Sequence, residues 1–215
     1  MIMKSIRVLS LPLLAIIATT PAGAASRDAS DRMGPLKRAA QFCSGTYALC
    51  IKAPCTPIAS RGKGGTSIDS ALCSCDVVTG WSMGPAKCEA RMEAKSGSYT
   101  TLMSTYSNMF NATNKTLTCS STDTRWASCY GAPCVIDAKD PTKANCTCPV
   151  KQGAASTLGG DCQQSACAGI WSAATPQADA GANAIFAAYM KKNNPTVPSP
   201  PPAEACPATA APGAR

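Results

Sequence analysis

Apolar side chains recur at helical spacing in two stretches of the chain that contain no cysteine. The first stretch spans about 98–111, between Gly97-Ser98 and an Asn/Thr-rich segment. The second spans about 177–192 and ends on two lysines that complement the helix dipole, with a proline just beyond. Both patterns predict amphipathic helices, and a shorter stripe predicts a third over 31–42. The apolar positions of the three stripes are Tyr99, Leu102, Met103, Tyr106, Met109 and Phe110; Ala182, Ile185, Phe186, Tyr189 and Met190; and Leu36, Ala39, Ala40 and Cys43.

The N-terminal segment has the three parts of a signal peptide. Lys4 and Arg7 give it a positive start, and the apolar run Val8–Ala18 is too short to span a bilayer. Ala22-Gly23-Ala24 then matches an A-x-A cleavage site. We expect residues 1–24 to be removed after Ala24, which leaves 215 − 24 = 191 residues in a secreted or periplasmic protein with no membrane span.

Fourteen cysteines and no histidine dominate the composition. In an exported chain, an even number of cysteines predicts a disulfide framework, here of up to seven bridges. Aromatic residues make up only 5% of the chain, so covalent bridges must supply stability that packing of large side chains cannot. The framework residues are Cys43, Cys50, Cys55, Cys73, Cys75, Cys88, Cys119, Cys129, Cys134, Cys146, Cys148, Cys162, Cys167 and Cys206.

Two other uses of these cysteines are open. Cys-x-Cys pairs bind soft metals such as Cu(I) or Zn²⁺ as thiolates, and an exposed Cys-x-Cys of lowered pKa exchanges disulfides. The export signal and the absence of any Cys-x-x-Cys favour structural disulfides over a metal-thiolate or redox protein. We therefore predict no cofactor and no metal.

The cysteines fall into two series with matching sequence around them. ALCSCDVVTG at 71–80 and ANCTCPVKQG at 144–153 share five of ten positions, and CIKAPC at 50–55 matches CYGAPC at 129–134. Six cysteines in the same order predict a tandem duplication. The first series is Cys43, Cys50, Cys55, Cys73, Cys75 and Cys88; the second is Cys119, Cys129, Cys134, Cys146, Cys148 and Cys162.

The repeat also predicts a pairing scheme. Each Cys-x-Cys would bond to its own Cys-x4-Cys, because an extended Cys-x-Cys places both sulfurs on one face. Cys43–Cys88 and Cys119–Cys162 would close the two modules, and Cys167 would pair with Cys206. Six cysteines permit fifteen pairings, so the spacing favours this scheme without proving it.

The predicted fold is small and disulfide-rich, mainly α with short extended segments, and contains a tandem duplication of a six-cysteine module. The expected organisation is a signal peptide (1–24), a first module with an N-terminal helix (25–88), a helical connector (89–118), a second module (119–167), a C-terminal helix (168–194) and a Pro/Ala-rich tail (195–215).

Composition excludes more functions than it suggests. Without histidine there is no Ser-His-Asp or Cys-His mechanism, and no paired carboxylates stand out among twelve acids. The charge of +8 falls to +6 without Lys4 and Arg7 and is scattered, so nothing indicates nucleic acid. We expect a non-catalytic binding protein whose partner is another protein or an anionic surface ligand. Recognition would use the divergent loops 56–72 and 135–145. The candidate contact residues are Tyr47, Trp81, Trp126, Tyr130 and Trp171.

Overall fold

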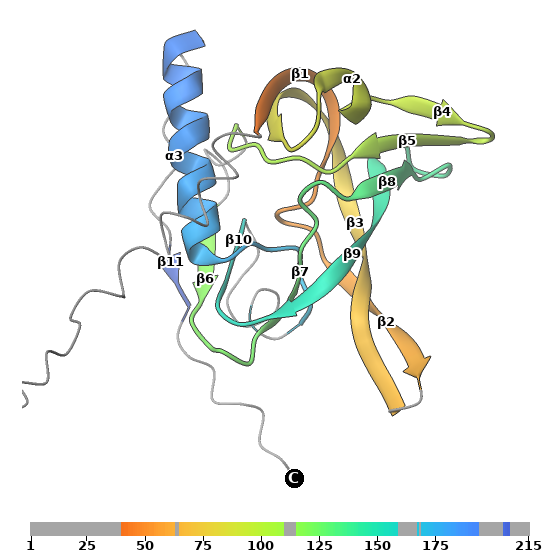
Figure 1. Cartoon of the computed structure of the whole chain (residues 1–215), viewed down its shortest axis with the longest axis vertical. Coiled ribbons are helices and arrows are strands. Elements are labelled where there is room, and N and C mark those ends of the chain that lie inside the picture. Colours follow the sequence, from red (N-terminus) through yellow and green to blue (C-terminus); the bar gives the residue numbers. More distant parts are fainter. Residues whose placement is uncertain are drawn as a thin grey trace, which may run out of the picture.

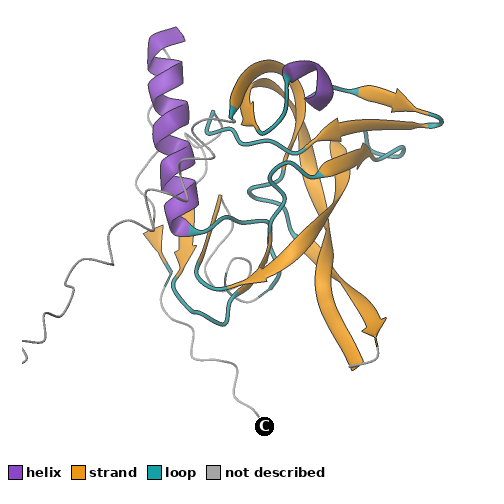
Figure 2. Ribbon diagram, in the orientation of Figure 1, coloured by secondary structure: helices purple, strands orange, loops and turns teal. Residues whose placement is uncertain are grey.

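The computed structural model describes residues 40–62, 65–109, 115–158, 167, 169–193 and 204–206 (Figure 1). This part is mainly β, with 54% strand and 16% helix (Figure 2), so the prediction of a mainly α fold is wrong. The elements are β1 (Gln41–Leu49), β2 (Cys55–Gly62), β3 (Gly65–Gly84), α2 (Cys88–Arg91), β4 (Ala94–Ser96), β5 (Tyr99–Met103), β6 (Thr116–Cys119), β7 (Arg125–Ala127), β8 (Pro133–Ile136), β9 (Lys143–Gln152), β10 (Ala155–Leu158), α3 (Pro176–Asn193) and β11 (Glu204–Ala205).

Two long strands, β3 and β9, form the centre of an eight-stranded sheet. One edge of β3 pairs first with β2 and then with β1, and its other edge pairs antiparallel with β9. In Figure 1 the β2–β3 and β4–β5 hairpins extend away from this centre. Along β3, Ala71, Cys73 and Cys75 are buried while Leu72 and Ser74 are exposed, so small side chains form the inner face of the sheet.

The two Cys-x-Cys phrases lie side by side on these strands. Cys73 is directly opposite Cys146, its equivalent in the sequence alignment. An antiparallel pair in which equivalent residues face each other has an approximate two-fold axis at that point. The described core around this axis consists of cysteine and alanine packed with few larger side chains.

Each Cys-x-Cys is bonded to the Cys-x4-Cys that precedes it, as the repeat predicted. The inner cysteines join neighbouring strands directly, as Cys55–Cys73 and Cys134–Cys146. The outer ones form Cys50–Cys75 and Cys129–Cys148. The same nested pattern therefore occurs on both sides of the axis.

Strand registers repeat in the same way. If the CIKAPC and CYGAPC segments are aligned, β7 pairs with β9 in the register in which β1 pairs with β3, and β8 pairs with β9 as β2 does with β3. The matching pairs are Thr46↔Thr79 with Arg125↔Gln152, Tyr47↔Val78 with Trp126↔Lys151, Ala48↔Val77 with Ala127↔Val150, and Cys55↔Cys73 with Cys134↔Cys146. We call residues 41–106 the first half and residues 116–174 the second half.

A segment at the end of each half crosses to the other half. The Ser104 amide donates to Ala132 O at 2.9 Å, and the Ser172 amide donates to Ala53 O at 2.9 Å. Ala132 and Ala53 are equivalent positions in the two Ala-Pro-Cys turns. Each segment then returns to its own half, through Thr105 N to Ala48 O (3.2 Å) and Ala173 N to Ala127 O (3.0 Å). We call 104–106 and 172–174 the closing segments.

The third bridge of each half corrects the predicted pairing. Cys43–Cys88 is confirmed, but Cys119 bonds to Cys167 and not to Cys162. Cys119 is nevertheless the counterpart of Cys43, because the β6–β10 pair Cys119↔Ala155 corresponds to Cys43↔Ser82. Because Cys167 is bonded to Cys119, the predicted Cys167–Cys206 pairing is wrong. Cys206 is also disulfide-bonded, and Cys162 lies outside the described residues.

The predicted helix at 177–192 is confirmed as α3. Its buried Phe186 and Met190 pack against Met83 and Tyr106, and Tyr189 stacks on Phe42 with ring centroids 3.8 Å apart. Although α3 follows the second half in sequence, these contacts bind it to β1, β3 and the closing segment of the first half. Within the described part of the chain, no helix is long and apolar enough to cross a membrane.

The predicted helices over 98–111 and 31–42 do not form in the described residues. Residues 99–103 are strand β5, paired with β8, and residues 41–42 begin β1; the segments 1–39 and 110–114 lie outside the described residues. The β5 sequence YTTLM is rich in β-branched and aromatic residues, which favour strands. Its apolar residues match helical spacing, but the backbone is extended and pairs with β8, and residues 104–108 beyond it are all buried.

Candidate functional site

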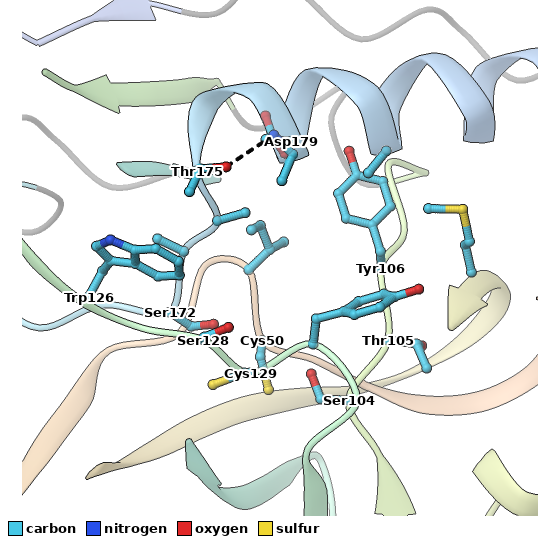
Figure 3. Close-up of a pocket in the computed structure, with 17 residues that line it drawn as sticks. Cys50, Ser104, Thr105, Tyr106, Trp126, Ser128, Cys129, Ser172, Thr175 and Asp179 are labelled. Carbon is cyan, nitrogen blue, oxygen red and sulfur yellow. Dashed lines mark hydrogen bonds between the residues drawn. The ribbon is translucent and has the colours of Figure 1, made fainter. Parts of the chain in front are cut away.

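A pocket of about 230 Å³ lies between α3 and the closing segments (Figure 3). Its walls come from both halves of the chain and from the first turns of the helix. The lining residues are Cys50, Ile51, Met83, Ser104, Thr105, Tyr106, Trp126, Ser128, Cys129, Tyr130, Ser172, Ala173, Ala174, Thr175, Ala178, Asp179 and Ala182. Tyr130 and Thr175 are the exposed residues among those described in the lining, and the rest are buried or partly buried.

The pocket lies across the approximate two-fold axis, because pairs of equivalent residues line it. The cysteine pair and the serine pair are identical, and the other three pairs differ in size or polarity. The pairs are Cys50 with Cys129, Ile51 with Tyr130, Ser104 with Ser172, Thr105 with Ala173, and Tyr106 with Ala174. A two-fold framework thus encloses a site that is not itself two-fold.

Three aromatic side chains line the pocket. Trp126 comes from β7, Tyr106 from the first closing segment and Tyr130 from the turn before β8. In Figure 3 the Trp126 and Tyr106 rings lie on opposite sides of the space below α3. Trp126 is 7% exposed and Tyr106 is 8% exposed, whereas Tyr130 is 39% exposed. The pocket is therefore lined by two buried aromatic side chains and one exposed one.

Among the described residues that line the pocket, Asp179 is the only acid, and none is a lysine or arginine. The side chain is 8% exposed and lies in the first turn of α3, where Thr175 caps the helix through a 3.2 Å bond from the Ala178 amide to its Oγ1. The Tyr106 hydroxyl donates a hydrogen bond to the Asp179 carboxylate, and Asn183 Nδ2 donates to it at 3.5 Å.

The pKa of Asp179 reflects this burial. Loss of hydration raises the pKa from the ordinary 3.8 to about 6, although the hydrogen bond from Tyr106 opposes the change. Burial, the Asp179 charge and this bond in turn raise the pKa of the Tyr106 hydroxyl. The helix dipole and the two hydrogen-bond donors stabilise the charged carboxylate, but they do not fully offset the loss of hydration.

Two buried polar atoms of the lining have no hydrogen-bond partner among the described residues. They are Thr105 Oγ1 and Trp126 Nε1. Next to Thr105, but outside the lining, the Arg91 guanidinium is 2% exposed and its three nitrogens also lack a described partner. Burial lowers the pKa of Arg91. Buried polar groups of this kind are rare in folded proteins, and two of the three residues, Thr105 and Arg91, lie together near Gly84.

The structure places the five aromatic residues predicted from the sequence in different environments. Trp126 and Tyr130 line the pocket. Tyr47 is fully buried, and its hydroxyl donates to Trp81 O at 3.4 Å; burial raises its pKa to about 12. Trp81 packs against Tyr189 of α3 with ring centroids 5.6 Å apart. The backbone of Trp171 forms an isolated antiparallel β-bridge with Pro54. Of the two candidate loops, 56–72 contains most of the β2–β3 hairpin, and 135–145 contains the short β8–β9 turn.

Sequence reasoning did not find Asp179, Tyr106 or Thr105. Tyr106 was counted in a helical stripe, and Asp179 was only one of twelve acids. The sequence offered only one indication of this site, an acid in the first turn of a helix that follows a partly apolar segment. Without the fold this indication is weak.

The sulfur clusters of the core consist of disulfides. Three sets of cysteines have their sulfur atoms within 4.8 Å of one another, and every member is disulfide-bonded. A disulfide sulfur is not a thiolate, so these clusters could hold a soft metal only after reduction. Six bridges among the described residues indicate an extracellular or otherwise oxidising compartment.

Comparison with known proteins finds no match to this chain among family models, curated proteins or solved structures.

Proposed function

We propose that this chain is an exported, non-catalytic binding protein whose ligand site is the pocket on the approximate two-fold axis. The observation that supports it is the composition of the walls, since both halves and α3 contribute to one concave, largely apolar surface. Such surfaces with a few convergent polar groups are the usual form of a ligand site. The volume is below the roughly 300–1,000 Å³ of drug-sized sites, which favours a small molecule.

The proposal includes two features of the sequence. The signal peptide is removed after Ala24, and the halves arose by tandem duplication of a six-cysteine module. Support for the duplication comes from the nested disulfides, the equal strand registers and the meeting of Cys73 with Cys146. A duplicated framework whose pocket-lining positions differ is consistent with selection on what the pocket binds.

The ligand site can be tested by filling it. Ala178→Trp places an indole in the pocket wall, and Ala188→Trp is the matched control because Ala188 is exposed on the same helix. Native mass spectrometry of the secreted, oxidised protein should show a small molecule on wild type and Ala188→Trp but not on Ala178→Trp. Equal loading of all three proteins would reject the pocket as the site, and so would failure of every protein to bind any member of a metabolite library.

The metal-thiolate and redox alternative is tested by intact mass. We expect alkylation without reduction to leave the mass of the mature protein unchanged, and alkylation after reduction to modify all fourteen cysteines. Free thiols in the native protein, together with stoichiometric copper or zinc, would instead support the alternative.

A further inference from the structure

The described lining of the pocket contains one carboxylate and three aromatic side chains, and no basic side chain. We propose that its ligand is a small amine or quaternary ammonium cation, paired with Asp179 and enclosed by Trp126, Tyr106 and Tyr130. This inference names the ligand class for the site proposed above and rests on that site being used.

The described wall of the pocket carries one negative charge, on Asp179. Asp179 is 8% exposed, and among the described lysines and arginines none forms an ion pair with it; the ion pairs found there involve Asp76 and Glu204. A buried carboxylate needs compensation beyond two hydrogen bonds. Because the pocket borders this carboxylate, a bound cation would supply the missing charge.

The aromatic walls of the pocket also suit a cation. The faces of tryptophan and tyrosine rings attract cations, and aromatic cages are a common way to hold an ammonium group. Met83, Ile51 and Ala182 complete an apolar lining that suits the methyl or methylene groups of such a ligand. Thr105 Oγ1, which has no described partner, is available to a hydroxyl or amide elsewhere on it.

An anionic ligand fits the site less well. The amino-terminal end of a helix attracts anions, but the Asp179 carboxylate in the same wall would repel them. Arg91 could attract an anion, yet it lies beyond Thr105 and outside the lining. The charge of the wall therefore favours a cation.

Two probes of nearly the same shape separate charge from shape. Choline carries a quaternary ammonium group, and 3,3-dimethyl-1-butanol replaces its nitrogen with carbon. Isothermal titration of the oxidised, full-length mature protein at pH 8 should show choline binding at least tenfold more tightly than the alcohol. Equal affinities, or no choline binding tighter than about 1 mM, would overturn the inference.

The variant Asp179→Asn keeps an acceptor for the Tyr106 hydroxyl and removes the charge. Choline affinity should fall about 30-fold or more, while the affinity of the alcohol stays within about threefold. Glu89→Gln is the control, because it removes one exposed negative charge from α2 and should leave choline affinity unchanged. A choline affinity that is unchanged in Asp179→Asn, or equally reduced in Glu89→Gln, would overturn the inference.

Choline affinity should also fall as the pH drops below about 6, since protonation of Asp179 removes its charge. The other titratable groups that face this space are Tyr106 and Tyr130, with Arg91 beside Tyr130. None of them changes its protonation state between pH 5 and pH 8. Choline affinity that is the same at pH 5 and pH 8 would argue against Asp179 as its partner.

The two proposals can fail separately. If Ala178→Trp abolishes ligand loading but choline fails the tests above, the pocket binds a ligand of another class and the proposed function stands. If choline binds equally well to Ala178→Trp and wild type, the pocket is not the site and both proposals fail.

Discussion

The two halves of the molecule have the same disulfide pattern and strand registers, yet they contribute different side chains to the pocket. Ser104 and Ser172 are identical, whereas Tyr106 faces the axis from one half and Ala174 from the other. The shared positions hold backbone and sulfur in place. The positions that differ are free of that task and give the pocket its shape, while its charge comes from Asp179 of α3, outside both halves.

Removal of a core disulfide tests whether the halves are equivalent and should have the largest effect. The double variants Cys55→Ala/Cys73→Ala and Cys134→Ala/Cys146→Ala should each lower the free energy of unfolding by about 2–5 kcal/mol. The bridges span 18 and 12 residues, so loop entropy alone separates the two costs by only about 0.4 kcal/mol. Urea denaturation of both variants measures this. Costs that differ by more than about 2 kcal/mol would show that the two cores are not energetically alike.

The acid in the pocket has the next largest effect and comes from α3, outside both halves. The folded-state pKa of Asp179, about 6, is above its ordinary value of 3.8, so its contribution to stability is fully present below pH 3.8 and is lost as pH rises through 6. Asp179→Asn should therefore raise the free energy of unfolding by about 3 kcal/mol at pH 8 and leave it nearly unchanged at pH 3.5. Urea titrations at the two pH values check this. An equal effect at both would mean that the Asp179 charge is not the cause.

The hydroxyl of Tyr106 has no counterpart at Ala174, and its removal isolates one difference between the halves. Tyr106→Phe removes the donor to Asp179 but keeps the ring packed near Phe186, 6.2 Å between centroids. We expect a loss of about 2 kcal/mol at pH 8, because hydrogen bonds to charged groups contribute about 1.5–3 kcal/mol. Thermal or urea unfolding measures the loss. It should be smaller in the Asp179→Asn background, and an undiminished loss there would contradict the pairing.

The ion pairs of Asp76 provide the smallest effect. Lys52 and Lys143 lie 2.7 and 2.6 Å from its carboxylate, whereas the equivalent position of β9 is Pro149. Burial raises the pKa of Asp76, but the hydrogen bonds from Lys143 and Lys52 outweigh it and hold the pKa below its ordinary value. The stabilisation is therefore present above pH 3.8 and is lost as pH falls further.

Asp76→Asn should cost about 1 kcal/mol or less at pH 7, because the partners are partly exposed. In about 1 M salt the cost should become smaller still. Urea denaturation at low and high salt makes the comparison. A cost that salt does not change would assign the effect to packing and not to charge.

The cysteine framework could be predicted from the sequence because it leaves a local signal. Repeated phrases around Cys50, Cys55, Cys73 and Cys75 define which bridges correspond, and α3 has a long apolar stripe with a cap. The Cys119–Cys167 bridge was not predicted, because Cys162 matches the spacing of Cys88 after the Cys-x-Cys phrase more closely than Cys167 does.

The strands could not be predicted in the same way because the inner face of the sheet is made of alanine and cysteine. In ALCSC the large apolar residue, Leu72, points outward, so hydrophobic alternation is reversed relative to a normal strand. The pocket could not be predicted either, because its residues come from distant segments that the closing segments and α3 bring together.

The crossing of the closing segments has a consequence for the history of the site. A single module cannot satisfy its own Ala-Pro-Cys turn, because the donor to Ala53 or Ala132 belongs to the other half. If the halves descend from one module, as proposed, that ancestor functioned as a homodimer with strands exchanged between subunits. Its binding site was then necessarily symmetric, and any acid in it was present twice. Fusion into one chain removed this restriction and allowed a site with a single Asp179.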